Sequence, residues 1–106
     1  MKAELCIISG RSAMDEIFGN ADSISHSVDL MLSGERVATI DCVDLEAMYE
    51  MFNIEKTAES FNVDSERLNV IMVKYDKHIK FKKYKTILRP IIKHGIKEIM
   101  VTKQII

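Results

Sequence analysis

The chain has 106 residues, of which 47% are apolar and 29% charged, and its formal net charge is −1. These values are typical of one globular domain spanning residues 1–106, and they exclude a globally disordered chain. The charge is nevertheless unevenly distributed, because residues 1–73 carry five basic and fourteen acidic residues, whereas residues 74–106 carry ten basic and two acidic ones. An uneven charge distribution of this kind influences which partners a protein binds and how fast it associates with them.

The N-terminal segment predicts a central strand followed by a short helix. Residues 3–9 (AELCIIS) end in an apolar run without alternation, as in a strand with neighbours on both sides. Ser12 is a suitable N-cap for a helix over residues 12–18, which a Gly-Asn pair then ends. Residues 20–27 (NADSISHS) are polar and are expected to form a loop.

The next segment predicts a β-hairpin. Val28, Leu30 and Leu32 alternate with more polar positions, which indicates a half-buried strand. The turn at residues 33–35 (SGE) then leads into a returning strand over residues 36–42 (RVATIDC).

Residues 44–61 predict an interrupted helix. Asp41 or Asp44 is a suitable N-cap, and an apolar stripe at helical spacing follows. The stripe consists of Leu45, Met48, Tyr49 and Phe52. It breaks at Asn53, after which a shorter apolar pattern resumes out of phase over residues 54–61, so we expect the helix to kink or restart there.

Residues 68–75 (LNVIMVKY) are rich in β-branched side chains and predict a strand. Residues 79–83 allow two interpretations. They could form a strand with one solvent-exposed face, or they could begin a continuous helix. The strand is favoured because Pro90 would destabilise the continuous helix by roughly 3 kcal/mol, whereas a helix that begins at Thr86 holds Pro90 in its opening turn. Gly95 ends that helix.

A final strand over residues 96–102 (IKEIMVT) completes the order β-α-β-β-α-β-β-α-β. This order predicts an α+β fold, a mixed and mostly antiparallel sheet with two to three helices packed largely on one face. No apolar segment is long enough for a membrane span or a secretion signal, and Cys6 and Cys42 form no CxxC pair. We therefore expect two buried thiols in a cytoplasmic protein that does not bind a membrane.

The lysine-rich segment 77–97 is the first candidate binding site. Its basic residues could neutralise phosphates or carboxylates, while Phe81 and Tyr84 offer rings on which bases could stack. Lysines on an edge strand or an exposed helix can equally be simply solvated. The residues expected to contact a nucleic acid or an acidic partner are Lys77, Lys80, Lys82, Lys83, Tyr84, Lys85, Arg89 and Lys93.

The acidic helix expected over residues 44–61 is the second candidate. Its negative face could dock onto a basic partner, as a nucleic-acid mimic would, or onto the basic segment of a second copy in a homo-oligomer. A solvated face is the simpler interpretation. The residues expected to contact a basic partner are Asp44, Glu46, Glu50, Glu55 and Glu59.

Catalysis and metal binding find little support in the sequence. His26, His78 and His94 show no metal-ligand spacing, and the sequence has no phosphate-cradling or nucleophile motif. Only the fold could bring a cysteine beside a histidine as a nucleophile–base pair. We therefore expect no metal, no cofactor and no enzymatic activity.

Three hypotheses of function follow from these patterns. The first is a small non-enzymatic regulatory or interaction protein, which binds a macromolecular partner (a protein in preference to a nucleic acid) through its charge-polarised surfaces. The second is a nucleic-acid-binding module that uses residues 77–97. The third is a small nuclease-like enzyme without a recognisable motif.

Overall fold

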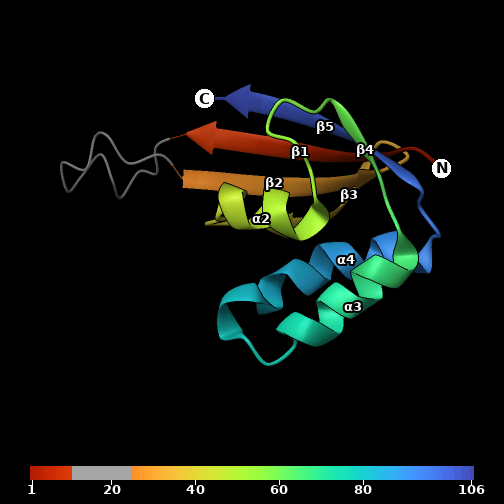
Figure 1. The fold of residues 1–106 in the computed structure, drawn as a ribbon. Helices are drawn as coiled ribbons and strands as arrows, with labels where there is room; N and C mark the ends of the chain where they lie inside the picture. The colour runs from red at the N-terminus through yellow and green to blue at the C-terminus, as the bar shows by residue number, and fades with distance from the viewer. Residues whose placement is uncertain (11–24) are drawn as a thin grey trace.

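A computed structural model describes residues 1–10 and 25–106, and the helix expected over residues 12–18 lies outside this part of the chain. The described residues form a five-stranded sheet with helices beside it (Figure 1). In chain order the elements are β1 (Ala3–Gly10), β2 (Ser25–Leu32), β3 (Glu35–Ile40), α2 (Leu45–Phe52), β4 (Ser60–Asn62), α3 (Ser65–Tyr75), the 3₁₀ helix η1 (Ile79–Tyr84), α4 (Lys85–Lys93) and β5 (Glu98–Ile105).

The sheet has the strand order β3-β2-β1-β5-β4, so that β1 lies at its centre. β1 pairs with β2 in antiparallel and with β5 in parallel orientation, and the two remaining pairs are antiparallel. The helices lie on one side of the sheet (Figure 1). The predicted α+β fold, with a mixed and mostly antiparallel sheet and helices largely on one face, is thereby confirmed.

Alternation along the central strand creates the core beneath the helices. Ala3, Leu5 and Ile7 are buried, whereas the residues between them are only half-buried. Leu5 pairs with Leu30 on one side and with Val101 on the other, and all three are buried in the same core. Because successive side chains of a strand point to opposite faces, one face of the sheet packs against the helices. The other face carries the polar and half-buried side chains.

The β2–β3 hairpin is confirmed, although its first strand begins earlier than predicted. Ser33 and Gly34 both adopt positive φ angles, 51° and 83°, as the two central residues of a tight hairpin turn require. The loop expected over residues 20–27 is wrong in its last three residues, because β2 already starts at Ser25 and His26 pairs with Ser9.

The helix predicted from residue 44 ends earlier than expected. Asp44 is its N-cap and accepts a hydrogen bond from Ala47 N at 3.2 Å, as predicted. Asn53 adopts a left-handed conformation, and Ile54 N then donates to Tyr49 O at 2.8 Å, which closes the helix. The helical continuation over residues 54–61 is wrong, because the chain turns away after Asn53 and forms the short edge strand β4.

Residues 65–75 form a helix, so the strand predicted over residues 68–75 is wrong. Asp64 accepts hydrogen bonds from Glu66 N at 2.9 Å and from Arg67 N at 3.4 Å, which caps α3. Leu68 and Ile71 are buried at a spacing of three, the period of a helix and not of a strand. The tertiary contacts of this apolar stripe override the β-propensity of the valines in the segment.

The cap of α3 provides a direct test of this correction. Replacing Asp64 with alanine should lower the free energy of unfolding by about 0.5–2 kcal/mol, because two backbone N–H groups lose their acceptor. Replacing Asp64 with serine should preserve most of the stability. Urea unfolding of both variants measures the difference, and equal stability of D64A and the wild type would contradict a helix that starts here.

The chain is helical from residue 79 to residue 93, so the strand favoured over residues 79–83 is wrong and the continuous helical alternative is nearer to the structure. η1 leads directly into α4, which contains Pro90 within its first two turns because it begins at Lys85. Thr86 Oγ1 donates to Lys83 O at 2.7 Å where the two helices join. Gly95 follows at a φ of 59°, so the predicted helix end is confirmed. The predicted final strand is confirmed as β5, which begins two residues later and ends three residues later than expected.

Candidate functional site

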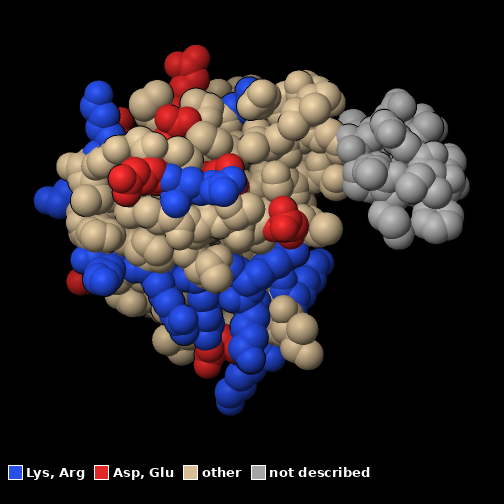
Figure 2. Space-filling view, turned by 180° about the vertical axis from the view of Figure 1, so that it is seen from behind, with Lys and Arg blue, Asp and Glu red and all other residues tan. Residues whose placement is uncertain are grey.

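Six exposed basic side chains of the segment 77–97 lie on the helical layer and its edges, and we call them the basic surface. They are Lys77, Lys80, Lys82, Arg89, Lys93 and Lys97. Figure 2 shows lysine and arginine side chains gathered over the lower half of the molecule, where the helices lie in Figure 1. The charge asymmetry of the sequence is therefore also an asymmetry in space.

The amphipathic sequence of η1 and α4 explains why these side chains point outward. Tyr84, Leu88 and Ile91 are almost fully buried at spacings of four and three. Lys82, Arg89 and Lys93 follow one another at spacings of seven and four, and all are exposed. Helical periodicity thus separates an apolar stripe that packs in the core from a basic stripe that faces water.

Two of the lysines predicted to bind a partner have partners within the chain. Lys83 Nζ donates to Cys42 O at 2.6 Å and to Asp41 O at 3.2 Å, which joins η1 to the loop before α2. Lys85 forms an ion pair with Asp76, and its side chain is only 15% exposed. Contacts within the chain therefore occupy these two lysines, and neither belongs to the basic surface.

Tyr84 is only 2% exposed, so the prediction that its ring stacks on a base is wrong for this packing. Its hydroxyl oxygen accepts a hydrogen bond from Asp44 N at 3.3 Å, and burial raises the pKa of the hydroxyl above its usual value. Phe81 is half-buried, and the centroid of its ring lies 4.5 Å from that of Tyr75. Both aromatic side chains belong to the packing between η1, α3 and the rest of the core.

The acidic residues do not form one helical face. Glu46 and Glu50 lie on α2, whereas Glu55 and Glu59 lie in the segment between α2 and β4. Glu46 pairs with Lys56 at 2.6 Å, and this hydrogen bond and charge raise the pKa of Lys56.

Within the described residues, one ion pair joins the two charged regions, the exposed pair between Lys80 and Asp44 at 3.8 Å. An exposed pair of this kind is worth at most about 1 kcal/mol. Most of the basic surface is therefore left without an acidic partner in the part of the chain that the structure describes.

Three large apolar side chains are exposed on α3 and at the start of η1. Val70 is 65%, Val73 78% and Ile79 91% exposed. Figure 1 shows that α3 lies beside α4, so these side chains belong to the same helical layer as the basic surface. Sequence patterns did not reveal them, because residues 68–75 and 79–83 were predicted to form strands, in which such side chains are expected to pack.

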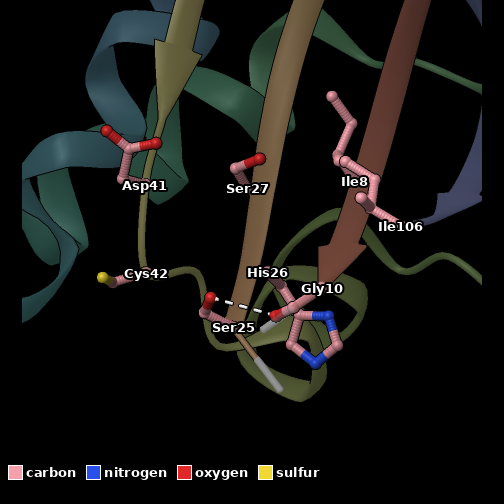
Figure 3. A pocket seen from close by; sticks show the side chains of 8 residues that line it. All are labelled: Ile8, Gly10, Ser25, His26, Ser27, Asp41, Cys42 and Ile106. Carbon is pink, nitrogen blue, oxygen red and sulfur yellow. Dashed lines mark hydrogen bonds between the residues drawn. The ribbon is translucent and has the colours of Figure 1, made fainter. Parts of the chain in front are cut away.

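The end of the sheet brings a serine and a histidine together, which sequence spacing could not show. Ser9 Oγ lies 2.6 Å from His26 Nδ1, because the two residues are paired across β1 and β2. His26 and Cys42 both line a hollow of about 350 Å³, but the Cys42 side chain points away from the imidazole ring (Figure 3). In the same view Ser25 Oγ donates to Gly10 O at 3.2 Å.

Cys42 and His26 are therefore not placed as a nucleophile–base pair. Cys42 is exposed and adopts a φ of 53°, so the expectation that both thiols are buried is wrong for Cys42. The Cys6 thiol is half-buried and donates to Glu4 Oε1 at 2.8 Å, and burial together with this carboxylate raises its pKa. Cys6 is therefore held as the protonated thiol, which is the less nucleophilic form.

The comparisons with known proteins give no match to a family model, to a curated protein or to a solved structure. Residues 1–10 and 25–106 contain no helix that is long and apolar enough to cross a membrane. They also contain no group of three or more His, Cys, Asp and Glu side chains arranged to hold a metal ion. Any proposal of function therefore depends on the surface chemistry described above.

Proposed function

We propose that the protein is a non-enzymatic interaction protein that binds an acidic protein partner through the basic surface. The main support is the exposed stripe of Lys82, Arg89 and Lys93 on a helical layer whose basic charge is mostly unpaired within the described residues. Charge complementarity of this kind accelerates association and selects an acidic partner over a basic one.

The exposed apolar residues favour a protein over a nucleic acid as that partner. Val70, Val73 and Ile79 lie on the same layer as the lysines, and aliphatic side chains of this kind pack against apolar groups in the desolvated centre of a protein interface. A phosphate backbone offers such side chains no apolar partner. The buried ring of Tyr84 further removes the base-stacking contact on which binding to single strands usually depends.

Binding of duplex nucleic acid is the second candidate function, because the same lysines and arginine suit phosphate groups. Contacts of this kind need no aromatic side chain, and they depend strongly on salt. The observation that favours this alternative is the number and exposure of the basic side chains on one layer of the molecule.

Fluorescence anisotropy with four labelled probes separates the two candidates. The probes are an acidic helical peptide with a leucine stripe, the same peptide with serines in place of the leucines, duplex DNA and duplex RNA. A protein-binding surface should bind the leucine peptide most tightly and retain part of this binding at physiological salt, because apolar contacts are not screened. Tighter binding of either duplex, with affinity that falls steeply with salt, would establish the nucleic-acid candidate instead.

A further inference from the structure

The face of the sheet opposite the helices brings three sulfur atoms into one region. Glu4 on β1 is paired with Met31 on β2 and with Met100 on β5. Directly paired residues point to the same face of a sheet. The buried neighbours of these residues, Ala3 and Leu5 among them, face the helices, so the two methionines flank Glu4 on the opposite face.

Cys6 supplies the third sulfur atom. It follows Glu4 by two residues on β1 and therefore lies on the same face. Glu4, Cys6, Met31 and Met100 all line one hollow of about 300 Å³, together with Lys2, Ala3 and Gly34. The two methionines lie two strand spacings apart, about 10 Å between Cα atoms, and their unbranched side chains are long and flexible enough to converge over Glu4.

We propose that Cys6, Met31 and Met100 form a binding site for a soft monovalent metal ion of the Cu(I) class. Thiolate and thioether sulfur atoms are the ligands that select Cu(I) over harder cations. Glu4 adds a negative charge, since its Oε1 atom lies 2.8 Å from Cys6 Sγ and also accepts a hydrogen bond from Thr102 at 3.0 Å. This site is independent of the basic surface and of the function proposed for it.

Binding of Cu(I) changes the protonation state of one ligand, Cys6. It changes the oxidation state of neither the metal ion nor the ligands. A coordinating metal deprotonates a thiol, so the Cys6 proton is released to solvent as the Cys6–metal bond forms. The thioethers of Met31 and Met100 carry no proton and bind through a sulfur lone pair. The metal enters and remains as Cu(I), so neither an oxidant nor a reductant takes part in the binding step.

Sequence spacing could not identify this site, because its residues come from three strands that are far apart in the chain. We expected no metal because the histidines, cysteines and carboxylates show no metal-ligand spacing. In the sequence, Cys6 has no second ligand nearby at such a spacing. The register of β1 with β2 and with β5 places the methionines beside it.

The test is a competition titration with Cu(I) supplied anaerobically as its bicinchoninate complex. Cys42→Ser is the parent protein for all measurements, because it removes the exposed second thiol and leaves Cys6 in place. We expect the parent to withdraw one Cu(I) ion per chain from the chelator. The ε-methyl NMR signals of Met31 and Met100 should shift on binding, while those of the core residues Met48 and Met51 should stay in place.

Variants on this parent assign the ligands. Met31→Leu and Met100→Leu keep the side-chain size but remove the sulfur, and Cys6→Ser keeps a donor for Glu4. Since loss of even an outer partner of a metal ligand lowers affinity about 10- to 100-fold, each variant should weaken binding at least on the order of tenfold. Met72→Leu, which removes a half-buried methionine of α3 outside the hollow, is the matched control and should bind as the parent does.

The proposal is overturned if the parent protein fails to compete with bicinchoninate. It is also overturned if Met31→Leu and Met100→Leu bind Cu(I) as tightly as the parent, because Cys6 alone would then account for binding. Circular dichroism of each variant confirms that a loss of binding does not come from a loss of fold.

Discussion

Replacing Lys82, Arg89 and Lys93 together with glutamate should lower the affinity for the acidic leucine peptide on the order of 100-fold at low salt. Each reversal at an exposed position changes the binding free energy by about 1 kcal/mol, and every 1.4 kcal/mol is a factor of ten in affinity. The three side chains form no ion pair within the described residues, so the fold should survive their replacement. Anisotropy titration of the variant and the wild type measures the change.

A second triple variant, Lys2→Glu, Arg36→Glu and Lys103→Glu, is the matched control. It changes the net charge by the same amount, but its exposed side chains lie at the N-terminus and on the strands β3 and β5. If the basic surface is the binding site, this control should lose only the small part of the affinity that depends on net charge. An equal loss of affinity in the two triple variants would show that binding has no preferred surface.

Replacing Tyr84 with alanine should lower the free energy of unfolding by about 3–5 kcal/mol, the typical loss for truncating a buried large aromatic side chain. Tyr84 is almost fully buried and connects η1 with the N-terminus of α2 through its hydrogen bond to Asp44. Tyr84→Phe keeps the ring but leaves Asp44 N–H without this acceptor, so its effect should be about 1 kcal/mol. Urea unfolding gives both values.

These variants also separate the two roles that have been considered for Tyr84. If Tyr84 is a core residue, Tyr84→Ala should be much less stable than Tyr84→Phe, and Tyr84→Phe should bind all probes as the wild type does. If the ring stacked on a base, Tyr84→Ala should have a small effect on stability but should weaken the binding of single-stranded nucleic acid, while Tyr84→Phe, which keeps the ring, should still bind. The second pattern would contradict the packing of η1 against the core.

The parts of the fold that depend on local patterns could be predicted from the sequence. The central strand β1, the hairpin turn at Ser33 and Gly34, the cap at Asp44 and the helix end at Gly95 all agree with the structure. In each case a few neighbouring residues determine the conformation, because the turn or cap requires a specific backbone geometry or a specific hydrogen bond.

The parts that depend on distant contacts could not be predicted. Residues 68–75 have the composition of a strand, but the burial of Leu68 and Ile71 decides in favour of a helix. The strand favoured for residues 79–83 was wrong for a similar reason, because in the helical conformation Tyr84 is buried in the core and Phe81 packs against it.

The candidate site shows the same division. Composition and spacing indicated the basic segment, and the structure keeps most of its residues exposed. Which lysines are free to bind depends on contacts across the fold, such as those of Lys83 with the loop before α2. The sulfur cluster around Glu4 likewise depends on strand register, which no local pattern specifies.

The most direct test of the proposed function is a competition at physiological salt between the labelled acidic leucine peptide and unlabelled duplex DNA for the wild-type protein. The proposal predicts that the peptide binds and that an equal concentration of DNA, counted in negative charges, does not displace it. Displacement of the peptide by DNA would contradict a protein-binding surface and assign the lysines to phosphate recognition. Failure of the peptide to bind even at low salt would show that the basic surface is only solvated.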